Sequence, residues 1–160
     1  MPQVSAGLLL YRRSAPDAEL EVFAGHMGGP FWARKPTHSW SIPKGLIEPR
    51  EEPLDTARRE FAEEVGVPAP DVDYRPLGEY RYSSGKRLLV LTAEADAPTG
   101  QVGAATVELE WPPRSGRIQT FPEIDRLAWW PIGEARELLV AAQGPMLDDL
   151  LALVGAAGDG

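Results

Sequence analysis

The sequence predicts one layered α/β (α+β) domain, and three observations support this fold class. Apolar or alternating runs typical of β-strands occupy residues 4–12, 76–83 and 86–95. A helical pattern with an apolar stripe occupies residues 54–65, and two more helical patterns follow Gly133. Because strands lie on both sides of a central helix, the pattern fits neither an all-α nor an all-β protein.

The remaining elements follow from local signals taken in chain order. Residues 19–24 are predicted to pair with the first strand through a turn at 14–17, and 26–39 reads as a loop. Further extended segments are expected at 40–43, 106–111 and 124–132, with a rigid basic loop at 111–117 and helices at 134–142 and 145–154. Neither an internal repeat nor a linker divides the chain, so one domain over 1–160 is expected, with 155–160 as a frayed tail.

Composition narrows the function classes. The chain has 160 residues, 43% of them hydrophobic, a net charge of −8 and no cysteine. The acidic charge disfavours nucleic-acid partners that are bound through phosphate neutralisation, and the lack of cysteine excludes disulfides and zinc–thiolate sites. We find neither a signal-peptide pattern nor an apolar run of ~18 residues. A cytoplasmic protein that uses no membrane is therefore expected.

The densest motif lies between Gly45 and Val67, in the stretch GLIEPREEPLDTARREFAEEVGV. The fixed positions of this motif are Gly45, Glu51, Arg59, Glu60, Glu63, Glu64 and Gly66. At a background of about 5–7% per residue, this spacing arises by chance in well under one sequence in a million. A solvated helix face would not require it, so we interpret the motif as a functional site.

Three of these glutamates favour metal binding. Glu60, Glu63 and Glu64 stand at helical spacing i, i+3 and i+4, so they share one face. Each pair of carboxylates repels by about 4 kcal/mol at 4 Å and an effective dielectric near 20. A hard divalent cation relieves this repulsion, and oxygen-only ligands suit Mg²⁺ or Mn²⁺. Arg59 is expected to hold one carboxylate through a forked hydrogen bond.

The glycines of the motif have backbone roles. Gly66 follows the last helical residue, where a left-handed cap favours glycine. Gly45 opens the loop before the helix, where a missing side chain lets the backbone approach a metal or a phosphate. The motif thus combines a ligand-bearing helix with two glycines that shape its ends.

With every fixed position present, the segment resembles the Nudix box, and the chain resembles Nudix hydrolases, which cleave nucleoside diphosphates linked to another moiety. The stretches GGPFWARK, WSIPKG, ELEWPPRSGR and FPEIDRLAWW also look like a bacterial subgroup of predicted nucleoside triphosphate pyrophosphohydrolases. The resemblance implies a Nudix fold, in which a mixed β-sheet is sandwiched between α-helices. Nudix proteins are often dimeric, so the resemblance leaves a homodimer open.

The resemblance also implies residue roles. Glu60, Glu63 and Glu64, with the Gly45 carbonyl, would hold Mg²⁺ or Mn²⁺, and Glu60 would help to activate water. Glu51 and Arg59 would support them. Many Nudix proteins add a glutamate from outside the box as general base, and the candidates here are Glu108, Glu110 and Glu123. We favour Glu110, because it adjoins the WPPRSG loop where a substrate has room to lie.

Substrate contacts are expected from four further residues. Lys44 adjoins the box glycine, and Arg34 and Arg114 lie in basic loops, so these three are candidates for polyphosphate contacts. Trp40 is a candidate for stacking on a nucleobase. The expected reaction is metal-assisted hydrolysis of a P–O–P link in a small nucleotide, either a nucleoside triphosphate or a dinucleoside polyphosphate. The alternatives are a non-catalytic nucleotide sensor and an RNA-cap or sugar-nucleotide hydrolase.

Overall fold

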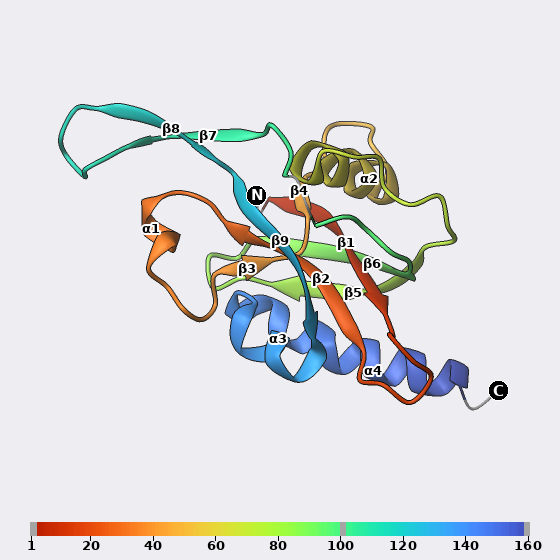
Figure 1. Cartoon of the computed structure of the whole chain (residues 1–160). Coiled ribbons are helices and arrows are strands. Elements are labelled where there is room, and N and C mark those ends of the chain that lie inside the picture. The colour runs from red at the N-terminus through yellow and green to blue at the C-terminus, as the bar shows by residue number, and fades with distance from the viewer. Residues whose placement is uncertain (1–2, 100–101, 159–160) are drawn as a thin grey trace.

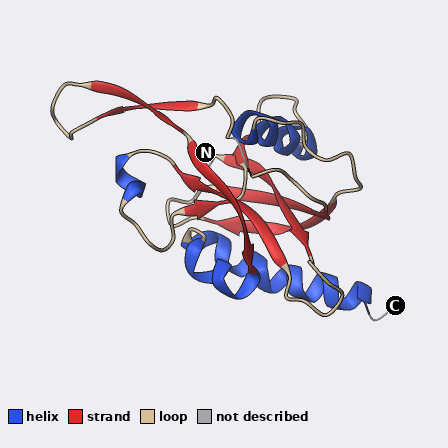
Figure 2. Cartoon of the chain, in the orientation of Figure 1, coloured by secondary structure: helices blue, strands red, loops and turns tan. Residues whose placement is uncertain are grey.

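The protein, described here by a computed structural model over residues 3–99 and 102–158, is a mixed β-sheet covered by helices on both faces (Figures 1 and 2). Helix α2 lies on one face, and helices α3 and α4 lie on the other. The helical elements are α1 (Pro30–Ala33), α2 (Pro53–Val65), α3 (Ile132–Leu138), the 3₁₀ turn η1 (Ala141–Gln143) and α4 (Gly144–Gly158). The predicted mixed α and β architecture is confirmed.

The large sheet has seven strands in the order β3-β2-β1-β6-β5, with β4 added to β1 and β9 added to β2. Strands β1 and β6 are parallel, and the other pairs are antiparallel. The strands are β1 (Val4–Arg12), β2 (Glu21–Met27), β3 (Trp40–Ser41), β4 (Lys44–Leu46), β5 (Arg75–Arg81), β6 (Arg87–Glu94) and β9 (Ile124–Pro131).

Strand β1 supplies both layers of the core because successive side chains point to opposite faces. Leu8 and Leu10 pack in the cluster beneath α2, whereas Leu9 belongs to the cluster beneath α3 and α4. All three side chains are fully buried. A strand buried on both faces reads as a continuous apolar run, which is why its bounds were predictable from sequence.

Helix α2 has clear signals at both ends. Pro53 occupies the first turn, where its missing N–H costs nothing, and Gly66 ends the helix with a φ of 88° in the left-handed region. Ala57, Phe61 and Val65 form the buried stripe against the sheet. The box therefore folds as the predicted loop–helix–loop, with its charged residues outside this stripe.

Four segments differ from the sequence-based prediction. The helix predicted at 134–142 begins at Ile132 and ends at Leu138, and a separate 3₁₀ turn covers Ala141–Gln143. The loop predicted at 26–39 is partly wrong. Its first two residues belong to β2, which continues through Met27, and Pro30–Ala33 forms the short helix α1. A strand β8 (Ile118–Pro122), which the sequence did not suggest, pairs with β7 (Thr106–Glu110). Helix α4 continues to Gly158 where a frayed tail was expected from residue 155, and residues 159–160 lie outside the described part.

The β7–β8 pair is a separate two-stranded hairpin that projects from the body beside α1 (Figure 1). An isolated hairpin is marginally stable in water, so contacts at its base matter. Gly28 N donates to Glu123 O at 2.9 Å, and Glu123 N donates to Ala105 O at the same distance. These bonds fix residue 123 where β8 meets β9. Within the described ranges, every helix is too short or too polar to cross a bilayer.

Candidate functional site

Strand β4 positions the first glycine of the box directly against helix α2. Ala6 of β1 pairs with Gly45, and a Cβ built on Gly45 would lie 2.0 Å from the carboxyl carbon of Glu60. No real side chain can approach that closely, so residue 45 must be glycine if the Glu60 carboxylate is to lie there. The structure thus places the backbone of the loop and the carboxylate of the helix in immediate contact.

Arg59 holds two carboxylates, where one was predicted. Its Nε and Nη2 donate to the two oxygens of Glu51 at 2.9 and 3.0 Å, and its Nη1 donates to Glu60 Oε1 at 2.8 Å. Thr56 Oγ1 also donates to Glu51 Oε1, at 2.6 Å, a partner that the sequence analysis missed. The Arg59 hydrogen bonds, followed by that of Thr56, lower the pKa of Glu51 to about 2. Glu51 is therefore an anionic anchor for Arg59.

Glu64 is a buried acid next to the loop. It is only 5% exposed, and its Oε2 accepts a 2.9 Å hydrogen bond from the backbone N–H of Lys44. Burial, and next the negative charge of Glu123, raise the pKa of Glu64 well above its ordinary value. Burial is also the largest cause of the raised pKa of Glu60, where it outweighs the ion pair with Arg59. Both carboxylates thus occupy sites that disfavour their anionic form.

Glu123 is the acid from outside the box that the structure brings to these carboxylates. Its charge contributes to the raised pKa of both Glu60 and Glu64. We call Glu60, Glu64 and Glu123 the acid cluster. Glu63 differs from its helical neighbours: its side chain is 51% exposed and meets Arg59 Nη1 at 3.4 Å.

Glu110, the favoured general base in the sequence analysis, does not join the acid cluster. It is the last residue of β7, at the loop end of the projecting hairpin (Figure 1). Its Oε1 accepts a 3.1 Å hydrogen bond from Gly116 N within that loop. Glu108 is exposed on the same hairpin. The WPPRSG loop thus lies at the far end of the hairpin, away from the box. Glu123 therefore replaces Glu110 as our candidate for the general base.

The predicted substrate residues separate into two groups. Lys44 lies at the acid cluster, since its charge acts on the Glu64 carboxylate. Trp40 is 5% exposed and packs edge-to-face against Trp130, with ring centroids 5.2 Å apart. Arg34 ends helix α1, and Arg114 lies in the hairpin loop with a φ of 64°, so neither basic side chain comes from an element that forms the acid cluster.

The donor chemistry of the box fits a hard divalent cation. Only carboxylate and carbonyl oxygens are offered, and a cation would relieve the repulsion that acts among the buried acids. The contact between Gly45 and Glu60 places the backbone of residue 45 beside a carboxylate. Within residues 3–99 and 102–158, however, no three acidic, histidine or cysteine side chains form a complete metal-binding group. The metal site therefore stays a prediction.

Replacing Glu64 by glutamine is expected to stabilise the protein in the presence of a chelator. A carboxyl whose pKa is raised in the folded state contributes stability below its ordinary pKa of 4.5, and this contribution is lost as the pH rises through the raised value. Glutamine keeps an acceptor for Lys44 N but carries no charge. In thermal melts, the Tm of Glu64→Gln should be higher than that of the wild type at pH 7, and the two Tm values should converge below pH ~4.5.

The half-exposed Glu63 provides the matched control for this experiment. Glu63→Gln should shift the free energy of unfolding by no more than about 0.5 kcal/mol at pH 7. A Glu64→Gln protein that melts below the wild type at pH 7, with chelator present, would show that burial of this charge is not a net cost.

Comparison with known proteins identifies one family over most of the chain and relatives over about half of it. The model of the NUDIX domain family matches residues 1–150. An RNA pyrophosphohydrolase of Pseudoalteromonas translucida is 38% identical over 71 residues, 42% of this chain and 41% of that protein. A 17.7 kDa phage T4 protein is 34% identical over 90 residues, 55% of this chain and 56% of its own. The chain thus spans about half the length of these relatives or less.

Solved structures support the fold across nearly the whole chain. A Caenorhabditis elegans Ap4A hydrolase binary complex gives a TM-score of 0.64 at 20% identity, covering 95% of this chain and 98% of that one. The NUDIX domain of Shewanella oneidensis NrtR, complexed with ADP ribose, gives a TM-score of 0.65 at 16% identity. That match covers 96% of this chain and 89% of the NrtR domain. At these identities, the likeness concerns the fold alone.

Proposed function

The chain belongs to the NUDIX domain family, and on that premise we propose that it is a divalent-metal-dependent pyrophosphohydrolase that cleaves a P–O–P link in a nucleotide. The observation that carries this proposal is the approach of Glu60 and Glu64 to the Gly45 loop, with Arg59 fixing the Glu60 carboxylate. Glu123 lies close enough for its charge to act on both. Burying several acids destabilises a protein unless function requires them, so their joint placement favours a catalytic role.

Within this proposal, Glu60, Glu63, Glu64 and the Gly45 carbonyl would hold Mg²⁺ or Mn²⁺. The bound ion supplies positive charge that stabilises the phosphoryl oxygens and the leaving group. Arg59 and Glu51 keep Glu60 in one rotamer, and Lys44 provides a cation for the polyphosphate. The Glu64 carboxylate is itself buried, so few water molecules would compete with an ion for its oxygens.

Glu123 is our candidate for the residue that accepts a proton from the attacking water. The turn between β8 and β9 fixes its backbone, and its charge acts directly on Glu60 and Glu64. The water oxygen would bond to one phosphorus of the P–O–P link, and the bridging oxygen would leave with the other phosphate group, so that each product ends in a free phosphate and at least one product carries a nucleoside. Glu123 would then be the catalytic carboxylate contributed from outside the box.

A nucleotide panel tests the proposal. The folded protein is incubated with Mg²⁺ and, separately, ATP, dGTP, diadenosine tetraphosphate, ADP-ribose and an RNA bearing a 5′-triphosphate. We expect release of phosphate, pyrophosphate or mononucleotide from at least one of them, and loss of that release with chelator. A folded protein that hydrolyses none of them would contradict the proposal.

The relatives named RNA pyrophosphohydrolase make RNA 5′ ends the second candidate substrate, and the RNA arm of the panel tests it. Against it stands the net charge of −8, because binding a nucleic-acid backbone usually relies on basic residues that neutralise phosphates. The ADP-ribose complex of the NrtR domain makes a nucleotide sensor the third candidate. Binding without turnover would favour the sensor.

A further inference from the structure

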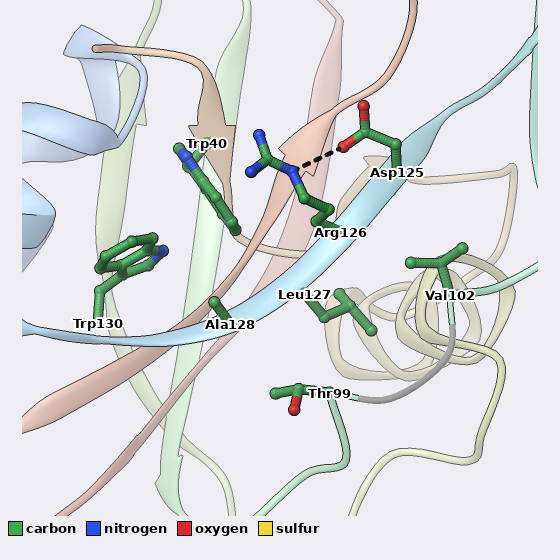
Figure 3. Close-up of a pocket in the computed structure, with 8 residues that line it drawn as sticks. All are labelled: Trp40, Thr99, Val102, Asp125, Arg126, Leu127, Ala128 and Trp130. Carbon is green, nitrogen blue, oxygen red and sulfur yellow. Dashed lines mark ion pairs between the residues drawn. The ribbon is translucent and has the colours of Figure 1, made fainter. Parts of the chain in front are cut away.

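Residues 102–105, which we call the strap, cross the C-terminal end of helix α2. Val102, the first of them, packs in the cluster beneath α2. On its other side, Val102 borders a cavity of about 420 Å³ together with Thr99 and Leu127 (Figure 3). Because the strap is not packed on that side, its place depends on its contacts with α2 and on the segments that anchor it.

Gly103 caps the last turn of α2. Its N–H donates to Glu64 O at 2.8 Å, and the last carbonyls of a helix have no partner within the helix itself. A Cβ built on Gly103 would collide with Glu63 O and lie 2.8 Å from the carbonyl carbons of Glu63 and Glu64. Residue 103 must therefore be glycine if the strap is to lie against this turn. The box glycine faces it, since a Cβ on Gly66 would lie 3.3 Å from Gly103 Cα.

The strap also holds the backbone of Glu123. Ala105, two residues beyond Gly103, accepts the 2.9 Å hydrogen bond from Glu123 N, and Gly28 N donates to Glu123 O just after the end of β2. One short stretch of backbone thus contacts both the last turn of α2 and the acid that comes from outside the box.

The chain that leads to the strap is tied to the sheet. Arg12 of β1 donates from Nη1 to Asp96 Oδ1 at 2.7 Å, and its guanidinium lies 4.2 Å from the centroid of the Trp129 ring on β9. Trp129 Nε1 in turn donates to Ala97 O at 3.2 Å. The chain is therefore anchored to the sheet both before and after Gly103, so the strap can set the position of the helix end rather than follow it.

We propose that Gly103 is a positioning residue, which holds the last turn of α2, with Glu63 and Glu64, in a fixed place relative to Glu123. Helix ends fray, and both box glutamates lie in the last turn of α2, which ends at Val65. The strap opposes this fraying by a close backbone contact and a hydrogen bond, and Gly103 acts only through the helix backbone. This inference rests on the proposed function, which assigns the two glutamates to the metal ion and Glu123 to the attacking water.

Gly103→Ala tests the proposal, because the added methyl group pushes the strap away from the helix. Partners that orient metal ligands contribute about 10- to 100-fold to metal affinity or activity. Calorimetric titration should therefore show an Mn²⁺ affinity about 10- to 100-fold below that of the wild type. At saturating Mg²⁺, kcat should fall while KM stays within about twofold of the wild-type value, because Lys44 on β4 is not displaced. A thermal melt verifies that the variant is folded.

Gly155→Ala is the matched control. Gly155 is exposed on α4, and apart from the backbone of its own helix a Cβ built there would meet no atom within 4 Å. Its Mn²⁺ affinity and kcat should therefore equal those of the wild type. If Gly103→Ala does not fold, Val102→Ala decides in its place, since it loosens the strap without a clash and should shift both quantities in the same direction.

A folded Gly103→Ala protein with the Mn²⁺ affinity and kcat of the wild type would overturn the inference alone. A lower Tm without any loss of Mn²⁺ affinity would also overturn it, because the strap would then be merely structural. A wild type that binds Mn²⁺ but hydrolyses no nucleotide of the panel overturns the proposed function, and the Mn²⁺ affinity of Gly103→Ala still decides whether Gly103 positions the box acids. Absence of Mn²⁺ binding by the wild type would overturn both.

Discussion

Replacing Glu60 by glutamine is expected to reduce kcat for the panel nucleotide by about 10²- to 10⁴-fold, the range typical of a lost catalytic carboxylate. Glutamine has nearly the same shape and can still accept the Arg59 hydrogen bond. The substitution removes the negative charge beside Gly45, where a divalent ion would bind. Steady-state kinetics with Mg²⁺ measures the effect, and a thermal melt verifies that the variant is folded.

Glu52→Gln is the control on the same helix. Glu52 is exposed at the N-terminus of α2, and its side chain makes no capping hydrogen bond. Its replacement removes the same charge without touching the acid cluster, so kcat should stay close to the wild-type value. A Glu60→Gln protein that keeps more than about a tenth of wild-type kcat would exclude Glu60 from the reaction, since general catalysis contributes more than that.

Replacing Phe61 by alanine is expected to lower the free energy of unfolding by about 3–5 kcal/mol. Phe61 is fully buried, and its ring centroid lies 5.9 Å from that of Phe23 on β2. The cavity left by alanine would lie between α2 and the sheet. Because the free energy of unfolding of natural domains is only about 5–15 kcal/mol, this single change removes a large part of it. Urea denaturation measures it.

Phe61→Leu is the matched variant, because it keeps an apolar side chain and fills most of the space. Phe61→Leu should lower the free energy of unfolding clearly less than Phe61→Ala does. Phe61 stands between Glu60 and Glu64 on the chain, so a loosened helix should also reduce activity by displacing both carboxylates. A Phe61→Ala protein that loses less than about 1 kcal/mol would show that α2 is not held by this side chain.

The parts of the structure that were predictable from sequence are those whose signals are local. The first strand was predicted at its observed bounds, Val4–Arg12, because burial on both faces leaves a continuous apolar run. Helix α2 was predictable from Pro53, Gly66 and the spacing of its apolar residues. The contact of Arg59 with Glu60 was also expected from their place in the motif, but the fork of Arg59 binds Glu51 in the loop before α2, which spacing along the helix could not predict.

The parts that were missed depend on contacts between distant segments. His26 was assigned to a loop, yet it is 2% exposed in β2 and its Nδ1 lies 2.8 Å from Asp125 Oδ1. Choosing the general base between Glu110 and Glu123 required knowledge of the path of the β7–β8 hairpin. Glu110 lies at the loop end of this hairpin, away from the box, whereas Glu123 lies at its base. Trp40 was assigned to substrate stacking, but most of its surface packs in the core.

The central claim is that the box carboxylates bind a divalent ion. Calorimetric titration with Mn²⁺ measures this directly, without any assumption about substrate. We predict saturable binding by the wild type and by Glu52→Gln, and loss of that binding in a folded Glu60→Gln, Glu64→Gln double variant. Equal Mn²⁺ affinity in the double variant and the wild type would contradict the account.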